Sequence, residues 1–519
     1  MEHTAPRPLL VQRLARWASG CYETCRLPFW ASMIWGLLAY TFAFTNKLLN
    51  HDEAGQLFGK GATVSSGRWG LSILDNLLPN FSMPWIYGIL TVFLIALSIC
   101  IIVRLFAIQS RLVQVVLAGS IMVFPSLIGL FGYMFTSSAY GVSFLCAVAA
   151  VWCIRQKMPL FALPALALMG FSLSIYQSYL SVTAGLLVVL LIQDLLQGEK
   201  AGSIFKRGLW YVAFLLTALA GYYIATQILL KLLGIGFNDY AAENVTFRVS
   251  ELPQKIGLAY VRFLRFFTWR QQALIPTGFS ARVHGVLALA CCTLGLLWLL
   301  GQKKADAGRV LLLLALVALL PLAINCMYLI TDPTSIHTLV LYGFVCLYVL
   351  AAVLLDFSLS SEAPQKCKWL LSRAALNLGI VALALIVIIN TYVANEAFLN
   401  LHLRYENSYA FYTSLLADLR SNPEFQEDTK LVVVGDYDSP DFYEYYFRFL
   451  PELTGVMGFL PDSYSYGAFM HYYLGLSIPI ATAEEAQQIM ATEEYQNMNV
   501  YPYYGSTKVI NDIFVVKLS

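Results

Sequence analysis

Residues 28–53 read PFWASMIWGLLAYTFAFTNKLLNHDE, an apolar run followed by a histidine and two acids. The apolar part, residues 28–46, is long enough to cross a hydrocarbon core of about 30 Å as one helix. Ionisable side chains at the exit of such a helix cost free energy unless they have partners or a function. Asp52 and Glu53 therefore predict a functional site just outside the first membrane span.

The composition of the chain extends this interpretation to its whole length. Of the 519 residues, 59% are hydrophobic and only 12% are charged, which excludes a soluble globular domain. The formal net charge of +2 gives no strong overall field, so nucleic acid is not an expected partner. We therefore predict a polytopic α-helical membrane protein.

Apolar segments of membrane-spanning length recur along the sequence. The eleven predicted spans are residues 28–46, 84–106, 112–130, 138–155, 159–175, 180–196, 209–233, 284–301, 310–330, 338–356 and 374–394. Little more than the four residues from Tyr176 to Tyr179 separates the fifth span from the sixth. The boundary between these two spans is therefore the least defined.

Basic residues indicate the orientation of the spans. They occupy the N-terminal arm and every second loop, as Arg7, Arg13, Arg16, Arg26, Arg104, Arg111, Arg155, Lys157, Lys200, Lys206, Arg207, Lys303, Lys304, Arg309, Lys366, Lys368 and Arg373. The alternate loops near 131–137, 176–179 and 331–337 contain neither Lys nor Arg. Cytoplasmic loops carry the excess of basic residues. We therefore predict a cytoplasmic N-terminus and, from the odd number of spans, a C-terminal tail on the opposite side.

This topology divides the chain into two predicted domains. Residues 1–394 form a transmembrane domain with external loops 47–83 and 234–283, and residues 395–519 form an external domain. The external domain has α/β character, with helical patterns at 396–420 and 482–491 and strand patterns at 430–435 and 513–517. It is rich in tyrosine, which suits sugar rings and equally suits docking onto a membrane interface.

The first external loop contains a second candidate residue. Arg68 precedes Trp69–Leu78, whose amphipathic pattern predicts a short helix lying in the membrane interface. Arginine can bind a carboxylate or a phosphate through two hydrogen bonds. Arg68 is therefore a candidate phosphate ligand, and the structural alternative is a pair with Asp52 or Glu53 that holds the loop.

The second external loop has a basic face of its own. After Pro253, helical spacing places Arg262, Arg265 and Trp269 on one side of a predicted helix, with phenylalanines opposite. Attraction to anionic headgroups would explain these arginines, and a lipid phosphate held in a groove is the alternative.

Histidines follow the same division of the chain. Five of the six lie in or beside external segments, namely His51, His284, His337, His402 and His471. For each of them, the simplest explanation is that hydrophilic segments hold hydrophilic residues. No pair has the spacing of metal ligands, so we predict no zinc site.

The order of several motifs resembles that of a known family. The motifs, from both ends of the chain, are His51-Asp52-Glu53, Gly67-Arg68-Trp69, Tyr466-Gly467-Ala468-Phe469, Tyr473-Leu474-Gly475, Tyr501-Pro502, Gly505-Ser506 and the terminal Val515-Val516-Lys517-Leu518-Ser519. This combination resembles the bacterial and phage serotype-converting O-antigen glucosyltransferases of the type II family. Many members carry two adjacent aspartates and a nearby arginine in the first loop. Here Asp52 precedes a glutamate and the next arginine is Arg68, which leaves the identity of the base open.

The resemblance implies a GT-C-like membrane glycosyltransferase of the bacterial inner membrane. Such an enzyme would transfer a hexose, here glucose, from a polyprenyl-phosphate donor to lipopolysaccharide O-antigen on the periplasmic side. In an inverting reaction, an acid of the first external loop takes the proton of the acceptor hydroxyl while arginines stabilise the phosphate charge. Asp52 is the first choice for this base and Glu53 is the second.

The remaining roles follow from the same expectation. Arg68, with Arg262 or Arg265, would hold the donor phosphate. His51, Tyr466 and His471 would contact the acceptor. Expected partners are the bilayer, a carrier-lipid flippase and a donor synthase, and no cofactor is expected.

Two other functional classes also fit a polytopic protein of this kind. A flippase or transporter of lipid-linked saccharides usually has ionisable residues near the bilayer midplane. The span interiors here are nearly free of charge, which favours a transferase. A polymerase or ligase of surface polysaccharide would use two lipid-linked saccharides, and product analysis would distinguish it.

Overall fold

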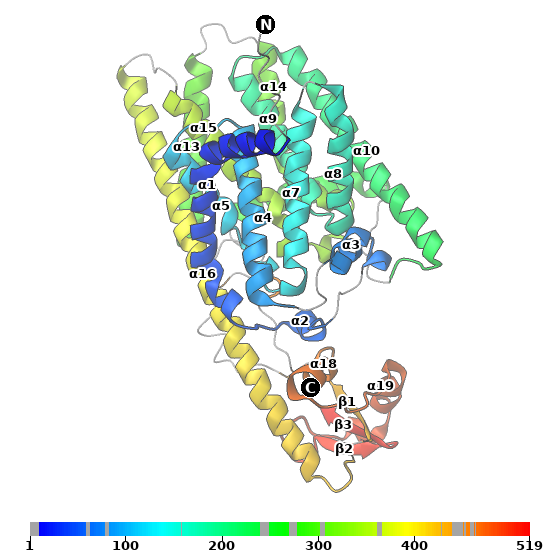
Figure 1. The fold of residues 1–519 in the computed structure, drawn as a ribbon. Helices are drawn as coiled ribbons and strands as arrows, with labels where there is room; N and C mark the ends of the chain where they lie inside the picture. The colour runs from blue at the N-terminus through cyan, green and yellow to red at the C-terminus, as the bar shows by residue number, and fades with distance from the viewer. Residues whose placement is uncertain are drawn as a thin grey trace.

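The chain folds into a bundle of long helices with a small α/β module at one end (Figure 1). In the computed structural model, the described residues are 10–58, 63–77, 82–156, 158–238, 249–268, 278–301, 307–360, 366–426, 428–437, 450, 453–456, 461 and 463–519. The helix α16 (Lys366–Ser421) runs along the bundle and continues into the module. It passes without a break through residue 395, where the sequence pattern places the start of the external domain.

Nine helical segments among the described residues are long and apolar enough to cross a membrane. They lie in α1 (Leu10–Thr45), α4 (Pro84–Leu105), α7 (Met134–Arg155), α9 (Tyr179–Leu196), α10 (Ala201–Leu233), α13 (Gly278–Gly301), α14 (Ala307–Ile324), η6 with α15 (Thr338–Phe344 and Val345–Ser360), and α16. The prediction of a polytopic α-helical membrane protein is confirmed.

Two of the predicted spans correspond to shorter helices. The span at 112–130 is divided into α5 (Arg111–Met122) and α6 (Pro125–Leu130). Proline lacks an N–H group and disfavours a helical conformation in the residue before it, so the chain bends at Pro125. The span at 159–175 consists of η2 (Pro159–Phe161) and α8 (Ala162–Ile175). The count of eleven spans stays a prediction.

Shorter helices lie between the spanning segments, including those in the two loops predicted to be external. These are α2 (His51–Gly55), η1 (Val64–Ser66), α3 (Trp69–Leu77), η3 (Val249–Glu251), α12 (Leu252–Thr268), η4 (Cys326–Leu329) and η5 (Pro333–Ser335). The helix predicted after Arg68 is confirmed as α3, which buries Gly70 and Leu71 beside α8. The helix predicted in the second loop is confirmed as α12, whereas Trp269 lies outside the described residues.

The module contains a three-stranded sheet with the order β1-β3-β2. Its elements after α16 are β1 (Lys430–Val434), α18 (Tyr466–Leu474), α19 (Ala483–Met490), α20 (Glu493–Gln496), β2 (Thr507–Ile510) and β3 (Ile513–Lys517). Strand β3 pairs in parallel with β1 and antiparallel with β2. The central position of β3 explains why its residues Ile513 to Val516 are all buried. Strands β1 and β3 lie where the sequence pattern predicts strands.

The module packs directly against the end of the bundle. The side-chain amide of Asn50 donates hydrogen bonds to the carbonyl oxygens of Gly132 (2.7 Å) and Gly455 (3.1 Å). Thr338 and Thr454 exchange hydrogen bonds between backbone N–H groups and side-chain hydroxyls, at 3.3 and 3.4 Å. A Cβ atom on Gly132 would lie 2.4 Å from the Gly455 carbonyl oxygen. The two backbones therefore approach closely only because position 132 has no side chain.

The opposite end of the bundle is held by an ion-pair network. Asp194 of α9 is buried and accepts hydrogen bonds from Arg155 and Arg207, at 2.6 Å from Arg155 Nη1. Arg207 also pairs with Glu199. Because both arginines neutralise one buried carboxylate, this network ties α7 to α9 and α10.

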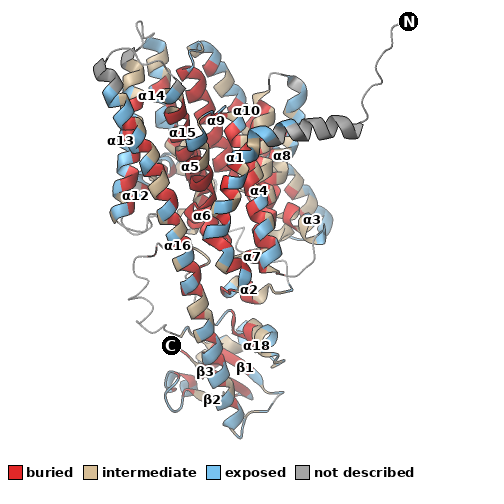
Figure 2. Ribbon diagram, turned by 60° about the vertical axis from the view of Figure 1, so that its left-hand side comes forward, coloured by how far each residue is buried: buried red, intermediate tan, exposed pale blue. Residues whose placement is uncertain are grey.

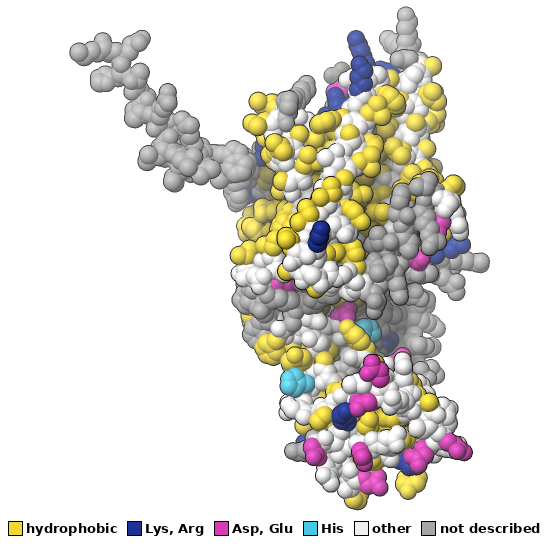
Figure 3. All heavy atoms as spheres, turned by 90° about the vertical axis from the view of Figure 1, so that its right-hand side faces the viewer, with side chains coloured by type: hydrophobic (Ala, Val, Ile, Leu, Met, Phe, Trp, Pro, Cys, Tyr) yellow, Lys and Arg dark blue, Asp and Glu magenta, His cyan; other side chains and the backbone are white. Residues whose placement is uncertain are grey.

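Burial and surface character agree with this architecture. Buried residues fill the interior of the bundle and continue along α16 into the sheet (Figure 2). In Figure 3, hydrophobic side chains cover much of the bundle face, several Lys and Arg gather at the end away from the module, and acids gather on the module. The apolar band between two polar ends is what a bilayer requires.

We expect Gly132→Ala to weaken the docking of the module on the bundle. The added methyl group would overlap the Gly455 carbonyl, and overpacking of this kind costs about 1–3 kcal/mol. Thermal unfolding and limited proteolysis of the detergent-solubilised protein would measure the loss. Gly221→Ala is the control, since a Cβ atom there meets no atom within 4 Å. Equal effects of the two substitutions would contradict the prediction.

Candidate functional site

Glu53 is fixed in a fully buried position at the start of the first loop, between α1 and α4. Asn50 caps α2, and its side-chain oxygen accepts a hydrogen bond from the Glu53 N–H at 2.8 Å. The Glu53 carboxylate has 0% exposure, forms an ion pair with Lys47, and accepts hydrogen bonds from the Ser82 hydroxyl and, at 3.1 Å, from the Phe135 N–H. A buried charge costs several kcal/mol unless it is paired and hydrogen-bonded. These partners meet that requirement and hold the loop against α4 and α7.

Asp52, the neighbouring acid, has different surroundings. Its side chain is half-buried, and among the described residues its carboxylate accepts a single hydrogen bond, from the Tyr464 hydroxyl at 3.3 Å. His51 before it is exposed. Asp52 is therefore the acid with an oxygen accessible to a substrate, while Glu53 has a structural position.

Arg68 is positioned by the turn that precedes it. Gly67 has a φ of 75°, in the left-handed region that favours glycine. Its carbonyl oxygen accepts a hydrogen bond from the Tyr222 hydroxyl of α10 at 3.0 Å, and Gln177 donates to the same hydroxyl at 2.8 Å. A Cβ atom on Gly67 would lie 2.6 Å from the Tyr222 oxygen. These contacts fix the Gly67 turn, and the turn sets the direction of the Arg68 side chain.

The Arg68 guanidinium lies against two tyrosines. Its Nη1 donates a hydrogen bond to the Tyr140 hydroxyl at 3.3 Å, and its central carbon lies 5.9 Å from the centre of the Tyr176 ring. The two tyrosine rings stack at 4.4 Å. Aromatic faces stabilise a guanidinium without neutralising its charge. In the described structure Glu53 pairs with Lys47 and not with Arg68, so the acid and the arginine occupy separate positions.

Helix α7 sets the spacing between these two positions. Its residue Phe135 contacts Glu53, and its residue Tyr140, five positions later, contacts Arg68. A rise of 1.5 Å per residue separates the two contacts by about 7.5 Å along the helix axis. This separation places an anionic position and a cationic position at the same end of the bundle.

His337 is a site residue that the sequence did not distinguish. It precedes η6, and its Nδ1 atom is buried without a hydrogen-bond partner among the described residues. Burial, and next the nearby Arg68 charge, lower the pKa of His337 to about 4. The imidazole is therefore neutral at neutral pH. In the sequence, His337 is distinguished only by its position in one of the short loops that lack Lys and Arg.

Arg262 and Arg265 lie on α12, away from Arg68. Arg262 is half-buried, and its Nε atom has no hydrogen-bond partner among the residues described. The side-chain oxygen of Asn325 is also buried and has no hydrogen-bond partner in the described part of the chain. The side-chain amide of Asn325 donates to the Ala259 carbonyl at 3.1 Å. Arg265 is exposed. Helix α12 packs on α13, α14 and η4, whereas α3 packs on α7 and α8, so the two arginine-bearing loops occupy different flanks (Figure 2).

The tail residues expected to contact the acceptor have distinct positions. Tyr466 is buried in the module core, where its hydroxyl donates to the Leu431 carbonyl at 3.4 Å and burial raises its pKa to about 12. His471 is exposed beside Tyr472. Tyr473 is the residue of α18 that lies near Glu53, and burial together with the Glu53 charge raises the pKa of its hydroxyl. Its place two helical turns after Tyr466 was the available sequence signal.

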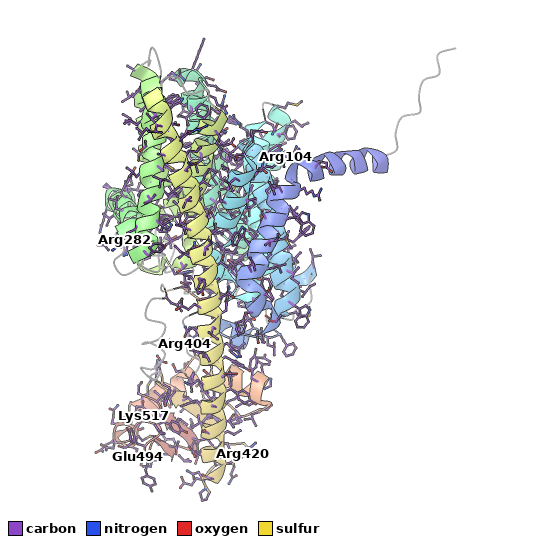
Figure 4. All side chains as sticks on the ribbon, turned by 90° about the vertical axis from the view of Figure 1, so that its left-hand side faces the viewer. Arg104, Arg282, Arg404, Arg420, Glu494 and Lys517 are labelled. Carbon is purple, nitrogen blue, oxygen red and sulfur yellow. The ribbon has the colours of Figure 1, made fainter. Side chains whose placement is uncertain are left out.

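A buried cation marks the junction of bundle and module. Arg404 of α16 is buried, and its Nε donates to the Asn400 side chain at 3.1 Å. Figure 4 places Arg404 where α16 leaves the bundle, with Arg420 farther along in the module. The Ser408 hydroxyl continues this polar face by donating to the Arg404 carbonyl at 2.7 Å. The spacing of Asn400, Arg404 and Ser408 at every fourth residue was the sequence signal for this face.

Comparison with known proteins identifies a family. A model of the family described as glucosyl transferase GtrII matches residues 41–348. The matched region contains both acids of α2, Arg68, α12 and His337, and it ends within α15, before α16 and the module. No match was found among curated proteins.

We expect the stability of the wild type to fall more steeply than that of His337→Gln between pH 7 and pH 5. The pKa of His337 is about 4 when folded and about 6.5 when unfolded, so only the unfolded state takes up a proton in this range. The contribution of the neutral His337 to the free energy of unfolding is therefore fully present above pH 6.5 and decreases as the pH falls toward 4. At pH 5 the free energy of unfolding is lower than at pH 7 by about 1 to 2 kcal/mol. Thermal unfolding across this range measures the difference, and parallel curves for the two proteins would contradict it.

Proposed function

Because the chain belongs to the GtrII glucosyl transferase family, whose model covers residues 41–348 of its 519 residues, we propose that it transfers glucose from a polyprenyl-phosphate donor to lipopolysaccharide O-antigen. The resemblance found in the sequence is thereby confirmed, and the chain is a membrane glycosyltransferase with a GT-C-like fold. The donor, the acceptor and the mechanism are the proposal.

The observation that carries the proposal is the placement of the acid and the arginine. Asp52 is accessible, Arg68 lies on an aromatic support, and both belong to the loop that emerges from the apolar bundle. A donor with a lipid tail reaches such a site from the bilayer, while a polar acceptor reaches it from the aqueous side. The geometry therefore suits transfer from a lipid-linked sugar to a polysaccharide.

We assign the role of base to Asp52. In an inverting displacement, the acceptor oxygen bonds to the anomeric carbon while the bond from that carbon to the phosphate oxygen breaks. Asp52 takes the proton of the attacking hydroxyl, and polyprenyl phosphate leaves with the electron pair. Glu53 is less suited to this step, because its carboxylate is enclosed by Lys47, Ser82 and the Phe135 N–H.

The leaving phosphate requires positive charge and hydrogen-bond donors. Arg68 supplies both, since a guanidinium carries five N–H donors and a permanent charge. His337 lies close to Arg68 and is neutral. It can donate a hydrogen bond to the phosphate, and unlike an anion it does not compete with the phosphate for the Arg68 guanidinium. Arg262, with its buried Nε atom, is the alternative cation on the α12 flank, whereas the exposed Arg265 suits lipid headgroups.

The proposed location is the bacterial inner membrane, with the N-terminus in the cytoplasm and the module in the periplasm. The excess of Lys and Arg in alternate loops supports this orientation. The site would then face the compartment in which O-antigen is modified.

We expect Asp52→Asn to lower the rate of glucosylation strongly without loss of stability. Removal of a general base typically lowers the rate by a factor of about 10²–10⁴. In contrast to Asp52→Asn, Glu53→Gln should lower the stability of the protein, by about 2 kcal/mol or more. The reason is that the partly exposed Lys47 loses its ion-pair partner. The gain of a hexose on the surface glycan, followed by mass spectrometry, measures activity, and thermal unfolding measures stability.

Two results would change this assignment. Full glucosylation by Asp52→Asn would remove Asp52 as the base. Loss of activity in Glu53→Gln with unchanged thermal stability would transfer the role to Glu53.

We expect Arg68→Lys to raise the KM for the polyprenyl-phosphate glucose donor about tenfold or more. The planar guanidinium of arginine can form a bidentate hydrogen bond with a phosphate, and the lysine ammonium cannot. The KM for the acceptor should change little. Arg282→Lys is the control, since Arg282 is an exposed arginine of α13 (Figure 4). Kinetics with both substrates varied separately would test this, and an unchanged donor KM in Arg68→Lys would exclude the phosphate role.

A further inference from the structure

The module presents a tyrosine to each of the two acids. Tyr464 donates its hydroxyl hydrogen bond to Asp52 at 3.3 Å. Tyr473 lies near Glu53, because α18 packs directly on α2, with Ala468 4.0 Å from a Cβ atom placed on Gly55. The carboxylates of the first loop and the hydroxyls of the module therefore meet at one interface.

Packing fixes the Tyr473 ring independently of its hydroxyl. The ring stacks on Phe469 at 5.4 Å with an interplanar angle of 25°, and the Tyr405 ring approaches it edge-on at 6.5 Å. Removal of the hydroxyl leaves these contacts in place. The position of the hydroxyl is thus set by the aromatic cluster and not by a hydrogen bond of its own.

The Tyr473 hydroxyl is buried and lacks a hydrogen-bond partner among the described residues. Buried hydroxyls are nearly always hydrogen-bonded in folded proteins, since desolvation without a partner is costly. The polar groups around the Glu53 carboxylate are Lys47, Ser82 and the Phe135 N–H, so Tyr473 is not used to neutralise that acid. A molecule bound between the module and the first loop would supply the missing partner.

The charge of Glu53 restricts which molecule can bind there. A phosphate next to this carboxylate would be repelled, whereas a neutral sugar hydroxyl can accept a hydrogen bond from Tyr473. Sugar rings carry such hydroxyls on adjacent carbons. Asp52 belongs to α2, on which the helix α18 of Tyr473 packs, so two neighbouring hydroxyls of one ring match Asp52 and Tyr473.

We propose that Tyr473 is an acceptor-binding residue, which holds the sugar hydroxyl next to the one that Asp52 deprotonates. This inference rests on the proposed function and adds the substrate contact made by the module. The module lies outside the matched region 41–348. In this proposal it adds acceptor recognition to a site whose donor side lies in the bundle.

The test compares Tyr473→Phe with the wild type, using the full-length protein, polyprenyl-phosphate glucose and O-antigen-bearing lipopolysaccharide. We expect the KM for lipopolysaccharide to rise about tenfold or more, because a site built to bind a hydroxyl loses its partner. The donor KM should stay unchanged and the unfolding temperature should not fall, since the ring contacts remain. Tyr211→Phe is the matched control, because it removes another buried hydroxyl, on α10 near Asp194.

The possible outcomes separate this inference from the proposed function. A wild type that transfers glucose, combined with an unchanged acceptor KM in Tyr473→Phe, overturns this inference alone. An equal rise of both KM values, or a lowered unfolding temperature, shows a structural role and also overturns it. A wild type that transfers no glucose overturns the proposed function and, with it, the role of Tyr473.

Discussion

The burial of the Glu53 carboxylate constrains the whole end of the bundle that faces the module. A charge with no exposed surface needs partners on every side, and these come from Lys47 at the end of α1, from Ser82 before α4 and from the backbone of α7. The first loop is thus held between three elements. The side chain of the preceding residue, Asp52, stays accessible next to the fixed Glu53.

The docking of the module depends on the same point. Asn50 caps the helix that bears both acids and also reaches the carbonyl oxygens of Gly132 and Gly455. Leu49 and Ala54, on either side of the acids, are buried in the hydrophobic core that the module forms with α16. The acids are therefore part of the interface between the module and the bundle, and module contacts can influence the chemistry of the loop.

Charge is distributed over the site in two parts. The anionic part is α2, where an ion-paired glutamate supports an accessible aspartate. The cationic part is Arg68, which lies on aromatic rings and near an imidazole that burial keeps neutral. Helix α7 contacts both parts and fixes their separation. An acid for the acceptor hydroxyl on one side and a cation for the phosphate on the other is the polarity that the proposed transfer needs.

The sequence alone determined the class of the protein and much of its local structure. Composition and apolar periodicity are local properties, so they predicted the polytopic bundle, the helix after Arg68 and the strands β1 and β3. The same reasoning identified Asp52 and Glu53, because ionisable groups beside a span need partners or a function, and Arg68, because it precedes an amphipathic segment. The family resemblance was also visible in the order of short motifs.

Only the tertiary structure decided what each candidate touches. Glu53 became the buried acid through Phe135, 82 residues away, and Asp52 met Tyr464, 412 residues away. His337 came to lie near Arg68, and Tyr473 near Glu53, although each pair is also far apart in the chain. Partners so far apart are brought together by packing of the whole bundle against the module. A local pattern cannot encode that, because desolvation and hydrogen bonding depend on what surrounds a side chain in space.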